Sequence, residues 1–259
     1  MEDKKKSGIL QYAFVISELT SREIKRKYAR STLGILWSVL NPLLMMVVMS
    51  LIFSKMFSGN IENFPIYFLT GQIIWTLFDT ASNSAMTALV DNKTLLIKAK
   101  LPKHTFILSR VYTALVNFGY TCIAYILMLA IFRIKPTWSM LLFPVGVIFI
   151  LIVSIGLSYL LATEYVFFAD IKYLYSVALR VLMYMSAVFY PLESLPEKMQ
   201  EIIKWNPLYL AIYFSRQCVM YGKVPENWVW IRLSIWGVAC MIIGMIVFKA
   251  KENKIMQTL

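Results

Sequence analysis

Two ionisable side chains, Asp79 and Arg180, lie inside stretches of sequence that are otherwise uncharged and apolar. A charge at the centre of a membrane costs about 2.5–3.5 kcal/mol on insertion scales, so such a residue is a functional candidate by default. A carboxylate there could relay protons or bind an ion. A relay normally needs several carboxylates or histidines, however, and these stretches contain only one. We therefore favour a structural pair, or a polar group that faces a water-filled cavity.

The sequence contains no recognisable catalytic or nucleotide-binding set. The three cysteines form no CxxC pair and His104 is the single histidine, so a zinc site of the usual Cys/His kind has no ligand set. The one Gly-Lys pair, Gly222-Lys223, lacks the residues that flank a phosphate-binding loop. We expect no cofactor and no metal in this chain, and ATP and Mg²⁺ would have to be bound by another subunit.

The composition is that of an integral membrane protein. Of the 259 residues, 59% are hydrophobic and 15% are charged, whereas an ordinary soluble domain has about 25% charged residues. The net charge of +12 could indicate nucleic-acid binding, but the basic residues lie between apolar stretches, where the positive-inside bias places them. We therefore expect membrane lipid and no nucleic acid as a partner.

Six apolar stretches are each predicted to form a transmembrane helix of an all-α membrane protein. The predicted spans lie near residues 33–54, 65–89, 109–132, 139–163, 173–190 and 228–248. Arg232, near the start of the last span, can extend to the interface beside Trp228 and Trp230. In the first span, Pro42 frees a backbone carbonyl and should kink the helix, which is tolerated beside a cavity or a partner.

The distribution of basic residues predicts the orientation. If the spans alternate, one side of the membrane carries 17 Lys and Arg residues and the other carries 7. Both termini are therefore predicted to be cytoplasmic. Residues 1–30 show apolar positions at helical spacing and lack a small-residue cleavage site, which favours an amphipathic helix in the cytoplasmic interface over a cleaved signal. Residues 31–259 would form a single six-helix transmembrane domain.

Two connecting segments are too apolar to be plain loops. Residues 91–104 mix leucine and isoleucine with four lysines, which indicates adhesion to anionic lipid, a short helix that docks on a cytoplasmic partner, or both. Residues 191–227 contain two short apolar stretches bounded by prolines. These are too short to span, and we predict short re-entrant helices that dip into the outer leaflet or pack against the bundle.

Several segments in order along the chain resemble the type-2 ABC transporter permeases that export lipid-linked polysaccharides such as O-antigen, capsule and teichoic acid. These segments are REIKRKYARSTLGILWSVLNPLL (22–44), FPIYFLTGQIIWTLF (64–78), DNKTLLIKAKLPK (91–103), FFADI (167–171), and VFYPLESLPE with KWNPL (188–208). The resemblance implies a homodimer in a bacterial inner or plasma membrane, with two copies of a separate ABC ATPase and a channel at the dimer interface.

The resemblance also implies which residues contact the ATPase and which form the outer gate. The implied ATPase contacts are Arg22, Asn92, Leu95, Lys98, Lys100, Pro102 and Asp170. Ala169 stands where the family usually has an arginine before Asp170, so an arginine–aspartate pairing does not carry over. The gate would lie around Tyr190, Pro191 and Trp205, at the short helices before the last span.

The chemistry of such a substrate suggests further residues. An undecaprenyl-diphosphate-type glycan has a dianionic head, for which Arg26, Lys27 and Arg30 are the predicted cytoplasmic contacts. A sliding glycan suits aromatic faces with few fixed charges. The predicted translocation path and gate residues are Trp37, Asn41, Pro42, Tyr184, Phe189, Tyr190, Pro191 and Trp205.

Three functions compete at this level. The first is the permease subunit of an ATP-driven glycolipid exporter, which is not itself an enzyme. The second is an ion-coupled secondary transporter or channel, in which Asp79 would be essential. The third is a membrane-embedded sugar transferase, which would turn over without a partner despite the missing catalytic cluster. Because the chain contains no phosphate-binding loop, the first requires an ATPase partner.

Overall fold

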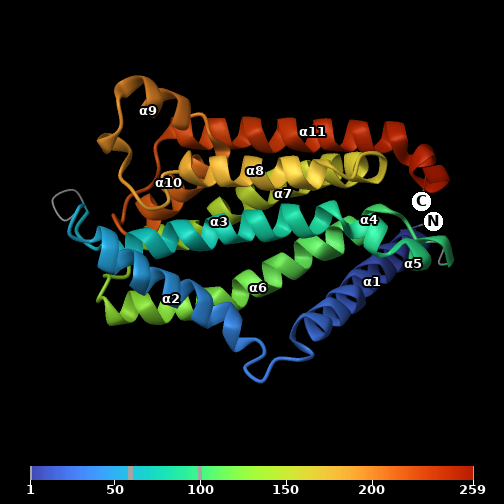
Figure 1. Ribbon diagram of the computed structural model, residues 1–259, viewed down its shortest axis with the longest axis horizontal. Coiled ribbons are helices and arrows are strands. Elements are labelled where there is room, and N and C mark those ends of the chain that lie inside the picture. The colour runs from blue at the N-terminus through green and yellow to red at the C-terminus, as the bar shows by residue number, and fades with distance from the viewer. Residues whose placement is uncertain (1, 58–60, 99–100, 259) are drawn as a thin grey trace.

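The protein is built from helices, and the described residues contain no strand. The computed structural model describes residues 2–57, 61–98 and 101–258. Figure 1 shows long helices that run roughly along the long axis, with short helices at both ends. The elements are α1 (Glu2–Tyr28), α2 (Leu36–Phe53), α3 (Phe64–Met86), α4 (Ala88–Asp91), α5 (Lys93–Lys98), α6 (His104–Ile131), η1 (Trp138–Leu142), α7 (Phe143–Phe167), α8 (Ile171–Tyr184), η2 (Leu192–Ser194), α9 (Glu197–Ile203), α10 (Pro207–Val219) and α11 (Asn227–Thr258).

Four helical segments of the described chain are long and apolar enough to cross a membrane. They are α2, α6, the continuous segment Trp138–Phe167 that joins η1 to α7, and α11. Each coincides with a span predicted from the sequence. At a rise of 1.5 Å per residue, the 32 residues of α11 reach about 48 Å, so this helix extends well past a ~30 Å hydrocarbon core.

The second and fifth predicted spans form helices, but these differ from the simple apolar type. Helix α3 has 23 residues and is interrupted by polar side chains along one face. Helix α8 ends at Tyr184, six residues before the predicted end, and its 14 residues reach only about 21 Å. The helix ends there because the chain turns, with Ala187 in the left-handed region at a φ of 48°.

Helix α3 lies at the centre of the bundle and packs against α2, α6, α7 and α10. Its buried face carries large apolar side chains such as Phe68, Ile74 and Leu77, all at most 2% exposed. Helix α10, which the sequence predicted as a short helix dipping into the outer leaflet or packing on the bundle, packs against α3 and α7. Nearly all of its side chains are buried.

Both ends of the chain lie at the same end of the molecule, beside α4 and α5 (Figure 1). Two ion pairs connect the helices there. The Nζ atom of Lys103 lies 3.3 Å from Glu252, and that of Lys251 lies 2.5 Å from Glu164. These contacts join the start of α6 and the end of α7 to the last turns of α11. We call this the terminal end, and the end that carries α9 and α10 the distal end.

Helices α7 and α11 approach so closely that glycine is required on both. A Cβ atom at Gly156 would lie 2.4 Å from the backbone of Cys240, and one at Gly244 would lie 2.0 Å from the carbonyl oxygen of Gly156. Small residues permit such contacts in membrane proteins, where apolar burial does not drive helix association.

We expect Gly244→Ala to destabilise the protein by about 1–3 kcal/mol, because the added methyl group forces the two backbones apart. Thermal unfolding in detergent, followed by a thiol-reactive dye that labels the buried Cys218, measures the change. Gly119→Ala in α6 is the control, because a Cβ there meets nothing within 4 Å. Equal melting temperatures for Gly244→Ala and the wild type would contradict the close contact.

Candidate functional site

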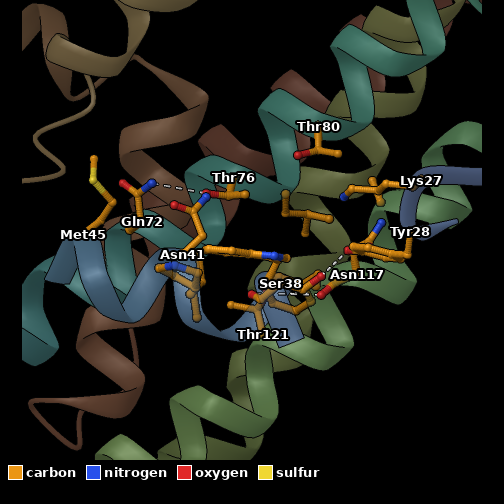
Figure 2. A pocket seen from close by; sticks show the side chains of 16 residues that line it. Lys27, Tyr28, Ser38, Asn41, Met45, Gln72, Thr76, Thr80, Asn117 and Thr121 are labelled. Carbon is orange, nitrogen blue, oxygen red and sulfur yellow. Dashed lines mark hydrogen bonds between the residues drawn. The ribbon is translucent and has the colours of Figure 1, made fainter. Parts of the chain in front are cut away.

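A cavity of about 310 Å³ lies between α1, α2, α3 and α6. It is lined by Lys27 and Tyr28 at the end of α1, by Trp37, Asn41 and Pro42 on α2, and by polar and apolar side chains of α3 and α6. Figure 2 shows the side chains of Asn41, Gln72 and Thr76 grouped on one side and those of Lys27, Tyr28 and Asn117 on the other. The cavity thus brings together one predicted head-group residue and three predicted path residues.

The proline in α2 explains how the cavity wall is held. Pro42 has no backbone N–H, so the carbonyl of Ser38 lacks its helical partner. The Thr121 hydroxyl of α6 donates to this carbonyl at 3.1 Å. The Ser38 hydroxyl in turn lies 2.5 Å from the hydroxyl of Tyr28, which donates to Asn117 at 3.4 Å. Pro42 thus borders a cavity, which is one of the two settings in which such a proline is tolerated, and the freed carbonyl joins α2 to α6.

Two amide groups of this cavity have unused hydrogen-bonding capacity. The Oε1 atom of Gln72 is buried and has no partner, while its Nε2 atom donates to Thr76 at 3.4 Å. In the part of the chain that the structure describes, the Asn41 side chain makes no hydrogen bond. Leaving the buried Gln72 oxygen without a partner costs about 1–3 kcal/mol, whereas the Asn41 amide is exposed to solvent. These groups are therefore available to a ligand or to water.

A second cavity of about 510 Å³ adjoins the first and lies nearer the terminal end. Lys27, Thr80, Ala114 and Asn117 line both cavities, and Arg26 lines the second. Arg26 and Lys27 are exposed, and neither forms an ion pair with a described residue. Glu23, Asp91 and Arg110 also line the second cavity, and Arg110 pairs with both carboxylates. The cations of Arg26 and Lys27 therefore leave this lining with a positive excess, which suits an anionic ligand. Arg30 is also exposed but lines neither cavity.

An ion triad fixes α1 beside this second cavity. The guanidinium of Arg110 on α6 lies 2.6 Å from Glu23 of α1 and 3.0 Å from Asp91 at the end of α4. The side chains of Arg110 and Glu23 are only 13% and 18% exposed. The Thr20 hydroxyl also donates to the carbonyl of Ser109 at 3.2 Å. The predicted N-terminal helix is therefore attached to the bundle along α6.

A polar stripe runs along α3 between the two ends of the molecule. Gln72, Thr76, Thr80, Asn83 and Thr87 recur every three or four residues, and each is half-buried or exposed. Their spacing places them on one face of the helix, opposite the buried apolar face. In a membrane, such a stripe fits a helix that borders a water-filled path. Sequence analysis missed it, although the spacing was visible; only Asp79, beside the stripe, was singled out.

Aromatic side chains gather at the distal end. Phe189 packs edge-to-face on Tyr184 and Tyr190 with ring centroids 5.6 and 5.5 Å apart, and it lies 5.9 Å from Phe53 of α2. The Tyr190 hydroxyl donates to the carbonyl of Tyr184, and Pro191 is buried. The structure thus brings four of the predicted path and gate residues into one group. Trp205 is not part of this group. Its ring faces Arg232, whose guanidinium carbon lies 4.4 Å from the ring centre.

Arg232 lies beside two tryptophans, as predicted, but only one of them, Trp228, belongs to the predicted pair. Its guanidinium lies 4.9 Å from the Trp228 ring, and the second ring that it faces is that of Trp205. Trp230 packs against Phe214 instead, with centroids 4.8 Å apart. Arg180 is exposed on α8, and Asp79 is half-buried on α3. Neither charge forms an ion pair with a described residue, so no structural pair accounts for them.

A buried arginine that sequence analysis did not single out holds the distal turn. Arg216 of α10 is 3% exposed and donates to the carbonyls of Tyr67, Ala187 and Val188 at 2.7–3.2 Å. Its guanidinium carbon lies 3.3 Å from the centre of the Tyr67 ring. A Cβ atom at Gly71 would lie 2.8 Å from the guanidinium, so glycine leaves room for it. This one side chain connects α10, α3 and the turn after α8.

The predicted ATPase contacts that the structure describes lie toward the terminal end. Arg22, Lys98 and Asp170 are exposed, whereas Asn92, Leu95 and Pro102 are half-buried. Lys100 lies outside the described residues. Because Leu95 packs against the core, the apolar side chain that α5 presents outward is Ile97, which is 57% exposed. A docking surface on α5 would therefore use Ile97 rather than Leu95.

Comparison with known proteins identifies the chain's relatives. The model of a family described as "ABC-2 type transporter" matches residues 15–220. The chain is 28% identical to the O-antigen export system permease protein RfbA of Myxococcus xanthus, over 97% of each chain. It is 25% identical to the polysialic acid transport protein KpsM of Escherichia coli, over 96% of this chain and 97% of KpsM. A capsule polysaccharide export inner-membrane protein, CtrC of Neisseria meningitidis, is 26% identical over 80% of this chain and 82% of CtrC.

The ion triad generates a prediction about α1. Arg110→Gln removes the cation between Glu23 and Asp91, so two carboxylates face each other without compensation and α1 loosens from α6. Hydrogen–deuterium exchange of the α1 amides should become several-fold faster. Lys25→Gln, which changes an exposed side chain of the same helix, should leave exchange as in the wild type. Unchanged exchange in Arg110→Gln would show that the triad does not hold α1.

Proposed function

The chain belongs to the ABC-2 type transporter family, and we propose that it is the permease subunit of an ATP-driven exporter that moves a lipid-linked polysaccharide across the membrane. Membership of this family implies an ABC ATPase as partner. The observation that carries the polysaccharide assignment is the match, over nearly the full length, to permeases named for O-antigen and polysialic acid transport. The cavities and the polar stripe of α3 are the features of this chain that would serve such a substrate.

The proposed assembly is a homodimer with two copies of the ATPase, which binds ATP and Mg²⁺. Each permease subunit would cross the membrane six times, with α3 and α8 completing the four apolar spans, and both termini would be cytoplasmic. Helix α2 supports an interface between subunits, because it exposes large apolar side chains such as Leu44, Val48 and Leu51 along most of its length. The terminal end then faces the cytoplasm, where the positive-inside bias requires most basic residues.

The head group of the substrate would bind where α1 meets the second cavity. An undecaprenyl-diphosphate-type lipid carries two phosphates, and a diphosphate loses hydration when it leaves the aqueous phase. The cations of Arg26 and Lys27 compensate this loss, and arginine can bind a phosphate through two parallel hydrogen bonds. Arg30, on the connection between α1 and α2, would attract the head group before it enters the cavity.

The glycan would then move along α3 toward the distal end. The amides and hydroxyls of the polar stripe exchange hydrogen bonds with sugar hydroxyls, so no single contact holds the chain. The aromatic group of Tyr184, Phe189 and Tyr190 offers ring faces to the apolar faces of sugars as they leave. The turn that carries Phe189 and Tyr190 is held by Arg216, which keeps these rings in register with α3.

Coupling to ATP would use the terminal end. The exposed residues of α1 and α5, together with Asp170 in the turn between α7 and α8, form the surface that an ATPase can reach. Closure of the ATPase dimer would favour one arrangement of α1 and α5 over another, which shifts the population of permease conformations. An ion-coupled carrier is the alternative, but it would need a relay, and Asp79 is the only carboxylate in the predicted spans.

Reversal of the three predicted head-group cations tests this function. The triple variant Arg26→Glu, Lys27→Glu, Arg30→Glu should abolish export, because it places negative charge where the diphosphate must bind. Surface polysaccharide measured with an antiserum or lectin reports export, and membrane fractionation checks insertion. A charge-matched control at the distal end, Lys135→Glu, Lys198→Glu, Lys223→Glu, should retain at least about half of the export. Normal export by the first variant would overturn the head-group assignment.

The partner is tested by purification of the tagged permease from native membranes in mild detergent. We expect an ABC ATPase in equal amount, identified by mass spectrometry, and ATP hydrolysis by the complex. Ile97→Glu on α5 should reduce recovery of the ATPase at least fivefold, because it puts a charge on the exposed apolar contact. A homo-oligomer that carries no ATPase, and that transports only with an ion gradient and not after Asp79→Asn, would support the ion-coupled alternative instead.

A further inference from the structure

The 310 Å³ cavity has the composition of a carbohydrate-binding site. Its lining combines the amides of Asn41 and Gln72, the hydroxyls of Thr76 and Thr80 and the indole of Trp37. Figure 2 shows the two amides and Thr76 facing the same space. Sugars are recognised by such sets, because amides and hydroxyls both donate and accept hydrogen bonds and an aromatic ring covers an apolar sugar face. The volume lies at the lower end of small-molecule sites.

The hydrogen-bonding state of these groups indicates a neutral, polar ligand. The Oε1 atom of Gln72 is buried without a partner. The Asn41 amide is exposed and makes no hydrogen bond to a described residue, so it is open to a ligand. Lys27 is the only charged side chain of the lining. A ligand rich in hydroxyls satisfies both amides without bringing a charge among the apolar side chains of α2 and α3.

The position of Lys27 relates this cavity to the diphosphate. Lys27 lines both cavities, and the second one also carries Arg26. In a lipid-linked glycan, the first sugar is bonded directly to the diphosphate. A diphosphate held by Arg26 and Lys27 therefore places that first sugar at the mouth of the cavity that contains Asn41 and Gln72, next to the start of the polar stripe.

We propose that this cavity binds the sugar attached to the diphosphate and thereby selects which lipid-linked glycans are exported. The inference rests on the proposed function and adds a specificity site to it. Asn41 and Gln72 are the specificity-determining residues, because their amides distinguish the arrangement of hydroxyl and acetamido groups on the sugar. Lys27 serves the phosphates rather than the sugar.

Binding to the purified permease–ATPase complex in lipid nanodiscs tests the inference. The probes are undecaprenyl diphosphate and the same lipid linked to glucose, galactose or N-acetylglucosamine. We expect at least one sugar-bearing probe to bind tenfold or more tightly than bare undecaprenyl diphosphate. In the double variant Asn41→Leu, Gln72→Leu this advantage should fall below about threefold, while binding of the bare lipid stays within twofold of the wild type.

Asn253→Leu is the matched control, because Asn253 carries an exposed amide on α11 and lines neither cavity. It should keep the sugar advantage. Retained binding of bare undecaprenyl diphosphate by the double variant shows that the variant is folded. Equal binding of bare and sugar-bearing lipids by the wild type, or a sugar advantage that survives in the double variant, would overturn the specificity site while leaving the proposed function standing. No binding of any probe to the wild type would overturn both.

Discussion

A helix in hydrocarbon must find a donor inside the protein for every carbonyl that its own backbone leaves free. Two such places determine this structure. At one, the proline in α2 frees the carbonyl of Ser38, and Thr121 of α6 satisfies it. At the other, the turn after α8 presents the carbonyls of Ala187 and Val188, and Arg216 satisfies both. The first hydrogen bond holds α2 at the wall of the 310 Å³ cavity, and the second set holds the turn that carries Phe189 and Tyr190. Both regions therefore depend on side chains that bind carbonyls left free by the helix backbone.

Helix α3 is shared by the two regions and explains how they act together. Its apolar face is buried among α6, α7 and α10. Its polar face borders the cavity at Gln72 and Thr76, and its first turns carry Tyr67 beneath the guanidinium of Arg216. A ligand that moves along this helix leaves cations at one end and reaches aromatic rings at the other. Such a ligand therefore exchanges contacts with charged side chains for contacts with aromatic rings as it moves along α3.

The sequence predicted the positions of most helices well, but it predicted poorly which side chains of different helices contact one another. Long apolar runs set the positions of α2, α6, α7 and α11, since apolar length is a local property. The end of α8 was misplaced by six residues, because it depends on a turn that Arg216 holds from more than 25 residues away. Leu95 was predicted to contact the ATPase; tertiary packing leaves it half-buried against the core, and its neighbour Ile97 is the exposed apolar side chain. The grouping of Lys27 with Asn41 also arises only when α1 folds back on α6.

The attachment of α1 has a mechanical consequence. This helix of 27 residues is about 40 Å long, and its last residue, Tyr28, touches both Ser38 of α2 and Asn117 of α6. A rigid rod of that length that pivots by about 5° at one end moves the other by about 3.5 Å, more than the length of the hydrogen bonds that Tyr28 makes. A tilt of α1 is thus transmitted through Tyr28 to the wall of the 310 Å³ cavity.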